Sequence, residues 1–283
     1  FFASNCLGAD GDAVMAARPN YRYLLETALH THRVFQPIDC HVNKNRWEMD
    51  FDQMRETLSA KTKTFLLCNP HNPVGRVLDR HELETIADLC LSNGTMICSD
   101  EIHADLVLDT DKQHIPIDSL HPEVEKQSIT LISASKAFNL PAIGGLSLAI
   151  IPNPEIRLAF QNKAYGVATH PGALAYAATL AAYKDCDDWL LQTIRYLRGN
   201  RDYLEAEIAN MEGLSMTHAE ATFLAWIDVS NLGLMSPVST FLAHGVDLSD
   251  GTEMGRADHV RLNFACHRST LEEVVRRLKA SLP

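Results

Sequence analysis

Two hydroxyl side chains and a lysine follow directly after an apolar run, as Ser133-x-Ser135-Lys136. The run at residues 129–132 predicts a buried strand that carries these side chains to a cleft. A lysine in a cleft can lose its proton by desolvation and bond covalently to an aldehyde. The hydroxyls can bind a phosphate, and a lysine with a phosphate cradle is what pyridoxal 5′-phosphate (PLP) requires. Taken alone, the segment is more often a strand end with a solvated lysine.

A proline-rich turn follows another apolar run, at residues 64–68. Residues 69–75 read NPHNPVG, and the two prolines and the glycine enforce an irregular turn where the strand ends. The amide of Asn72 can donate a hydrogen bond to an anionic oxygen. An ordinary strand-to-helix turn explains the segment equally well, because Asn-Pro is a common turn dipeptide.

A carboxylate stands at the end of a third apolar run, where residues 99–103 read SDEIH. In an open α/β sheet, such a position faces the ligand crevice. Asp100 could there pair with a protonated pyridine nitrogen and keep the ring able to accept the electrons of a carbanion. The alternatives are a helix N-cap for Asp100 and a packed surface histidine for His103.

Strand and helix patterns alternate along the first two thirds of the chain and predict the elements that position these residues. Strands are expected at 12–16, 62–68, 95–99, 128–133 and 146–151, and helices at 21–32, 50–59 and 79–93. Asp50 is a plausible cap for the second helix, and Gly94 ends the third. Helices then follow at 155–165, 171–183, 187–211 and 270–282, with short strands at 222–227 and 259–264. The pattern predicts a large α/β domain at 1–185 and a small C-terminal α+β domain at 186–283.

The order and spacing of the three motifs resemble those of the fold-type I PLP-dependent enzymes of the class I/II aminotransferase family, over essentially the whole chain. The resemblance is most specific to the cystathionine β-lyase, or C–S lyase, branch of the MalY/PatB kind. Its matching segments are CNPHNP at 68–73, SDEIH at 99–103, SKAFNLPA at 135–142 and RLN at 261–263. It implies a PLP-transferase-like α/β fold with a mostly parallel sheet in the large domain.

The resemblance also implies roles for individual residues. Lys136 is the catalytic residue that holds PLP and then acts as a base. The implied cofactor-binding residues are Tyr21, Asn72, Asp100, His103, Ser133, Ser135 and Lys136. Tyr21 stacks on the pyridine ring, with Tyr23 as a weaker candidate, and Arg261 binds the substrate α-carboxylate bidentately. The alternatives are a tyrosine packed at a helix start for Tyr21 and an exposed arginine on an edge strand for Arg261.

Two departures from many aminotransferases agree with the lyase branch. His103 stands where many members have tyrosine, and its role is either hydrogen bonding at the ring edge or packing. Residues 141–146 lack the arginine that many members place on the cofactor phosphate, which leaves Ser133 and Ser135 as visible phosphate partners. Family members are longer at the N-terminus, so we expect a preceding segment that contributes to the small domain and to phosphate binding.

The implied reaction is elimination of a thiol from a sulfur amino acid, which gives pyruvate and ammonia. An aminotransferase is the main alternative, because both reactions share their first steps, and a non-catalytic regulatory protein with the same fold is a third possibility. The resemblance implies a homodimer.

The bulk composition is that of an ordinary soluble globular protein, and the scattered cysteines fit a reducing cytoplasm. The net charge of −11 disfavours nucleic acid and anionic membranes as partners. The seven cysteines form no Cys-x-x-Cys pair, so neither a disulfide framework nor a metal site is predicted. No apolar run is long enough to span a membrane.

Overall fold

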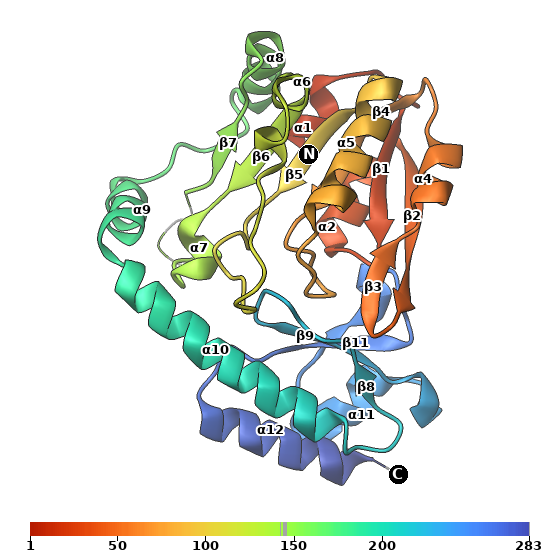
Figure 1. Cartoon of the computed structure of the whole chain (residues 1–283), viewed down its shortest axis with the longest axis vertical. Helices are drawn as coiled ribbons and strands as arrows, with labels where there is room; N and C mark the ends of the chain where they lie inside the picture. The colour runs from red at the N-terminus through yellow and green to blue at the C-terminus, as the bar shows by residue number, and fades with distance from the viewer. Residues whose placement is uncertain (142, 144–145, 283) are drawn as a thin grey trace.

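A seven-stranded sheet in the order β3-β2-β1-β4-β5-β6-β7 forms the centre of the computed structural model, which describes residues 1–141, 143 and 146–282 (Figure 1). Its strands are β1 (Ala13–Arg18), β2 (Val34–Asn43), β3 (Arg46–Met49), β4 (Thr62–Cys68), β5 (Met96–Asp100), β6 (Ser128–Ile132) and β7 (Leu148–Ile150). The inner strands pair in parallel, whereas β3 and β7 are antiparallel edges. The prediction of an α/β fold with a mostly parallel sheet is confirmed.

Helices cover both faces of this sheet. The helices in this part of the chain are α1 (Phe2–Cys6), α2 (Arg22–Leu25), α3 (Thr27–His30), α4 (Phe51–Thr57), α5 (Arg80–Asn93), the 3-10 turn η1 (Ile117–Ser119), α6 (Pro122–Lys126), α7 (Ala134–Ala137), α8 (Pro154–Ala164) and α9 (Ala173–Asp185). Successive strand residues alternate between two apolar cores, so Phe65 and Leu67 pack on one face while Leu66 packs on the other. This burial on both faces explains why the strands read as continuous apolar runs.

A second, four-stranded antiparallel sheet follows in the chain, in the order β10-β11-β9-β8. Its elements are α10 (Asp187–Ile208), β8 (Ser215–Met216), β9 (Leu224–Asp228), η2 (Ser230–Leu232), α11 (Pro237–Ala243), β10 (Ser249–Asp250), η3 (Gly251–Met254), β11 (His259–Asn263) and α12 (Arg268–Ser281). Helix α10 extends from the large sheet along the small one (Figure 1). It begins at Asp187, and the domain boundary at 185/186 stays a prediction.

The helix ends follow the local sequence. Asp50 caps α4 by accepting a hydrogen bond from the backbone N–H of Gln53, and Asp79 forms a capping box with Glu82 at the start of α5. Gly94 ends α5 with φ of +70°, a left-handed conformation that glycine adopts without strain. The caps predicted at residues 50 and 94 are confirmed.

Two parts of the large domain differ from the expectation. The helix predicted at 21–32 is two short helices, α2 and α3, separated at Glu26. The hairpin of β2 and β3 was not predicted. Its turn residues Lys44 and Asn45 both have positive φ, as a two-residue type I′ turn requires, and the Asn45 side chain tolerates this conformation. The asparagine was the available signal.

Within the described residues, no helix is both long and apolar enough to cross a membrane. The predicted segments 135–142 and 141–146 include Ala142, Gly144 and Gly145, which lie outside the described residues.

Candidate active site

The carboxyl ends of four neighbouring strands bring the predicted residues to one edge of the large sheet. Asp100 is the last residue of β5, and Lys136 follows β6 in the short helix α7. Strand pairing aligns Cys68 of β4 with Asp100, and Asp100 with Leu131 of β6. Because parallel neighbours lie about 4.8 Å apart, the residues that follow these strands must meet. The motifs therefore share one site, as the sequence predicted.

The carboxylate of Asp100 is partly buried at this edge. One of its oxygens accepts a hydrogen bond from the backbone N–H of Ile102, at 3.2 Å. In the described part of the chain, no basic side chain forms an ion pair with it. Burial raises the pKa of Asp100 to about 6, and the charge of Lys136 opposes this effect. The site thus holds a carboxylate that a cationic ring nitrogen would stabilise in its charged form.

The side chain of Lys136 is exposed and lines a cavity of about 560 Å³. Ser135, Phe223 and Asn263 line the same cavity. The sequence-based expectation was that burial desolvates this lysine. The structure contradicts its burial, because the Lys136 side chain is exposed along the cavity wall.

The two serines before Lys136 differ in their surroundings. Ser133 is buried, and its hydroxyl donates to the carbonyl oxygen of Leu146 at 2.8 Å while it accepts from the backbone N–H of Ser135 at 3.2 Å. Ser133 is therefore the N-cap of α7. Ser135 is partly exposed and lies on the cavity wall. Phosphate binding stays a prediction for both, and Ser135 is the more accessible of the two.

His103 is buried beside the site, and its ring contacts Phe223 edge to face at 5.7 Å between centroids. Burial, and then the charges of Lys136 and Arg261, lower the pKa of His103 to about 3, so the ring is neutral. Its Nδ1 atom has no hydrogen-bond partner among the described residues. Such a buried polar atom can bond to a ligand.

Tyr21 is partly buried, and Tyr23 meets its ring edge to face at 5.3 Å. Burial raises the pKa of Tyr21. Tyr23 and Asp100 add to this increase and Arg261 opposes it, so all three lie close enough to act on the phenol. Tyr23 is 58% exposed, which leaves Tyr21 as the better ring-stacking candidate.

Asn72 and Arg261 join the two sheets at the site. Arg261 lies on β11, and its Nη1 donates to Oδ1 of Asn72 at 2.9 Å, while Nη2 donates to Oγ of Ser249 at 3.2 Å. Asn72 is buried, and its backbone N–H contacts Sγ of Cys68 at 3.5 Å. Burial lowers the pKa of Arg261. The proposed substrate residue and a proposed cofactor residue are thus in direct contact.

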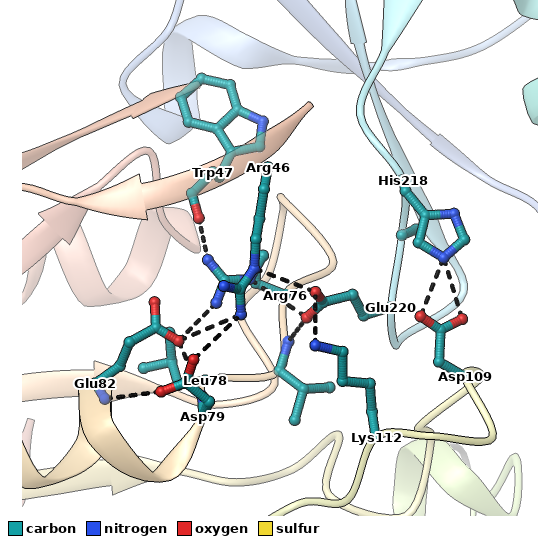
Figure 2. A network of polar contacts seen from close by, with 12 residues as sticks. Arg46, Trp47, Arg76, Leu78, Asp79, Glu82, Asp109, Lys112, His218 and Glu220 are labelled. Carbon is teal, nitrogen blue, oxygen red and sulfur yellow. Dashed lines mark hydrogen bonds and ion pairs between the residues drawn. The ribbon is translucent and has the colours of Figure 1, made fainter. Parts of the chain in front are cut away.

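Sequence reasoning missed a group of charged side chains that contact one another and are mostly buried (Figure 2). Arg76, four residues after Asn72, is 1% exposed, and Glu220 contacts it from the segment that leads into β9. The available signal was an arginine and a glutamate inside otherwise apolar surroundings, GRVL at 75–78 and AEATFLAW at 219–226. Their pairing across 144 positions could not be read from the sequence.

The residues present fit PLP. Asp100 supplies an anion for the ring nitrogen, Lys136 an amine for the aldehyde, and the neutral His103 an unpartnered ring nitrogen. Arg261 supplies a guanidinium for a carboxylate. Among the described residues, no cluster of His, Cys, Asp and Glu has the arrangement of a metal site.

Comparisons with known proteins identify the family of the chain. A family model for aminotransferase class I and II matches residues 1–278. Cystathionine β-lyase PatB of Bacillus subtilis is 35% identical over 83% of this chain, and the chain spans 62% of the length of PatB. The crystal structure of OvoB superposes with a TM-score of 0.96 and 39% identity, covering 99% of this chain and 74% of that one.

A PLP-bound C–S lyase from Staphylococcus hominis superposes with a TM-score of 0.90 at 28% identity, covering 99% of this chain and 70% of that one. The predicted resemblance to the cystathionine β-lyase and C–S lyase branch is confirmed by these similarities. The match to nearly the whole chain shows that it belongs to the class I and II aminotransferase family.

Proposed function

We propose that this chain is a PLP-dependent C–S β-lyase that releases a thiol, pyruvate and ammonia from a sulfur-containing amino acid. The observation that carries the proposal is that Asp100 and Lys136 follow neighbouring strands of the large sheet, while Arg261 of the small sheet bonds to Asn72 beside them. The similarity to cystathionine β-lyase PatB and to a C–S lyase supports elimination as the reaction.

PLP supplies, when bound, a ring that accepts the electrons of a carbanion at the substrate Cα. Lys136 would hold the cofactor through its amine, and the free amine would be the base that takes the proton from the substrate Cα. Asp100 would keep a proton on the ring nitrogen, and Arg261 would hold the α-carboxylate so that Cα stays near the lysine. The thiol leaves from Cβ with the proton taken from Cα, and water then hydrolyses the remaining three-carbon product to pyruvate and ammonia.

An assay without any keto-acid acceptor separates this proposal from transamination. Purified protein with PLP is incubated with L-cystathionine and other L-cysteine thioethers, and pyruvate, ammonia and free thiol are measured. We expect the three in equal amounts. Product that forms only when a keto acid is added identifies an aminotransferase and contradicts the proposal.

We propose further that the protein acts as a homodimer. Helix α9 exposes Leu174, Tyr176 and Leu180, at 76%, 57% and 68% of their surface, and such apolar faces in water mark interfaces. We expect light scattering to give twice the mass of one chain, and Leu180→Glu to shift the measured mass towards that of a single chain. Met235→Glu is the matched control, because Met235 is fully exposed on the small domain. A monomeric unsubstituted chain contradicts the proposal.

We propose the cytoplasm as its location. All seven cysteines are free, which suits a reducing compartment. Labelling of cysteines in freshly lysed cells, before reduction, tests this. We expect complete labelling after denaturation, and oxidised cysteines contradict it.

A further inference from the structure

A group of six charged side chains lies between the Asn72 loop and the small domain; we call it the Glu220 cluster. Asp79 is exposed, and the other five are buried or partly buried. Its members are Arg46, Arg76, Asp79, Glu82, Lys112 and Glu220. The charges balance, with three cations and three anions. Figure 2 shows Glu220 facing the cations from its own segment of chain. An anion in such surroundings is costly to bury unless its partners are in place.

Arg76 is the centre of the cluster on the large-domain side. Its Nη2 donates to Glu82 at 2.7 Å, its Nε to Glu220 at 3.3 Å and its Nη1 to the carbonyl oxygen of Trp47. Arg46 and Lys112 approach the other oxygen of Glu220, at 3.3 and 3.6 Å. A planar guanidinium with fixed donors holds all three partners in one geometry.

The segment of Glu220 is bonded to both loops that surround the site. The backbone N–H of Val77 donates to the Glu220 carboxylate at 2.8 Å, and the N–H of Ala221 donates to the carbonyl oxygen of Gly75 at 2.9 Å. On its other side, the carbonyl oxygen of Glu220 accepts from the N–H of Leu108 at 2.9 Å. These hydrogen bonds therefore fix the position of the Glu220 segment relative to Asn72.

Strand pairing connects the Glu220 segment to Arg261, on the substrate side of the site. Strand β9 begins at Leu224, four residues after Glu220, and its Trp226 pairs with Arg261 of β11. Arg261 then reaches back to Asn72 at 2.9 Å. A continuous series of contacts thus leads from Arg76 through Glu220 and β9 to Arg261, which bonds to Asn72. These contacts fix the position of the Arg261 guanidinium.

We propose that Arg76 and Glu220 are positioning residues for recognition of the substrate α-carboxylate. They touch no reacting atom in this arrangement; they fix Arg261 relative to Asn72 and the sheet edge. The inference rests on the proposed function only for the binding of an amino acid, and not for the reaction that follows.

A matched pair of ligands tests this role without turnover to lyase products. 2-Aminoisobutyrate has no Cα hydrogen to be removed, and isopropylamine is the same molecule without the carboxylate. The dissociation constants of both for the PLP-loaded protein are measured by the change in cofactor absorbance. Their ratio, amine over amino acid, reports how well the carboxylate is recognised.

We expect Glu220→Gln to lower this ratio at least tenfold, because the variant keeps an oxygen for Val77 but loses its attraction for Arg46, Arg76 and Lys112. The control is Leu278→Ala, which opens the small-domain core away from the cluster and is expected to lower stability but not the ratio. An unchanged ratio in a folded Glu220→Gln protein, or an equal fall in Leu278→Ala, overturns the proposal.

Arg46→Gln provides the test if Glu220→Gln does not fold, because the Arg46 side chain is 30% exposed and its loss is easier to accommodate. We expect a fall of about threefold in the ratio; no fall overturns the proposal. Absence of pyruvate from the unsubstituted protein contradicts the proposed lyase function and leaves these ratios interpretable.

Discussion

The two walls of the candidate active site are built in different ways. Asp100 and Lys136 come from strands that are direct neighbours in a parallel sheet, so hydrogen bonds of the backbone place them. Arg261 comes from the other sheet and contacts a residue 189 positions away. Its placement depends on side-chain packing of the Glu220 segment, with buried ions at its centre. The fold of the strand-end wall should therefore survive substitution of Asp100 or Lys136 even where activity is lost, whereas the geometry of the Arg261 wall should depend on the side chains that support it.

The largest effect is expected for Lys136→Ala on the strand-end wall. Elimination should fall by about a thousandfold or more, because no other amine takes over proton removal at Cα. The fold should stay intact, since Lys136 is exposed. Pyruvate release and the unfolding temperature are measured together, with Lys163→Ala, another exposed lysine, as the control. Retained pyruvate release would remove Lys136 from the catalytic role.

This wall was also the part that the sequence predicted best. Each apolar run that ends in SDEIH or SASK predicts a strand, the residue where the strand ends and the reactive side chain that follows it. Parallel pairing of the strands then brings these ends next to one another. The sequence did not reveal that Lys136 is exposed, because exposure depends on elements far along the chain, such as Trp189 and Phe223 at the same cavity.

The Arg261 wall was predicted less completely for the same reason. The residue itself was identified through the family resemblance, but its supports Arg76 and Glu220 were not, because ion pairs across 144 positions leave no local pattern. The hairpin that supplies Arg46 and Trp47 was missed as well, since a turn at Lys44 and Asn45 without glycine is a weak signal.

Asp100→Asn should change activity and stability in opposite directions, lowering the rate of elimination and stabilising the PLP-free fold at pH 8. Activity should fall roughly a hundredfold or more, because a neutral amide does not keep the ring nitrogen protonated. Burial raises the pKa of Asp100 to about 6, so its charged form opposes folding. Its contribution to stability is complete below the unfolded-state pKa of about 4 and is lost as pH rises through about 6.

Protein prepared without PLP should therefore be more stable as Asp100→Asn at pH 8, by roughly 2 kcal/mol, and indistinguishable at pH 3.5. Urea unfolding at the two pH values measures the difference. A variant that is less stable at pH 8 would show that the carboxylate has a partner that stabilises its charge.

Arg261→Ala should act mainly on substrate binding. Loss of a bidentate, charged hydrogen bond is worth about 1.5–3 kcal/mol, or roughly a 10- to 100-fold rise in KM for the amino acid. PLP affinity, measured by fluorescence, should change far less than KM, because Arg261 lies on the other sheet and reaches the cofactor residues only through Asn72. A normal KM would place the carboxylate elsewhere.

Gly75→Ala and Gly94→Ala separate packing from backbone strain. Both glycines have φ near +70°, so both variants carry a similar strain, about 1 kcal/mol. A Cβ at Gly94 meets nothing within 4 Å, whereas one at Gly75 would lie 2.9 Å from Cβ of Ala219. Gly75→Ala should therefore be the less stable variant in urea unfolding, and it should also weaken amino-acid binding by shifting the Glu220 segment. Equal effects of the two would show that this segment adapts and is not fixed.

The smallest effect is expected at His218, at the outer end of the same segment. Hydrogen bonds to Glu205 and then to Asp109 raise the pKa of His218 to about 9, against burial and the nearby charge of Arg201. Because this folded-state pKa exceeds the ordinary value of 6.5, its stabilisation is complete below pH 6.5 and is lost as pH rises through about 9. The side chain is 39% exposed, so solvent screening limits the effect to about 1 kcal/mol.

His218→Gln should thus lower the free energy of unfolding at pH 6.5 and leave it unchanged at pH 10. Urea unfolding at both values measures this, with His244→Gln as a control, since the exposed His244 forms a hydrogen bond with the backbone carbonyl of Thr240 and, among the described residues, no ion pair. The binding ratio of the two amine ligands should stay normal in His218→Gln, because the Glu220 cluster is intact. If the ratio falls as it does in Glu220→Gln, the outer ion pairs position Arg261 as strongly as the buried ones, and the support of this wall extends along the whole segment.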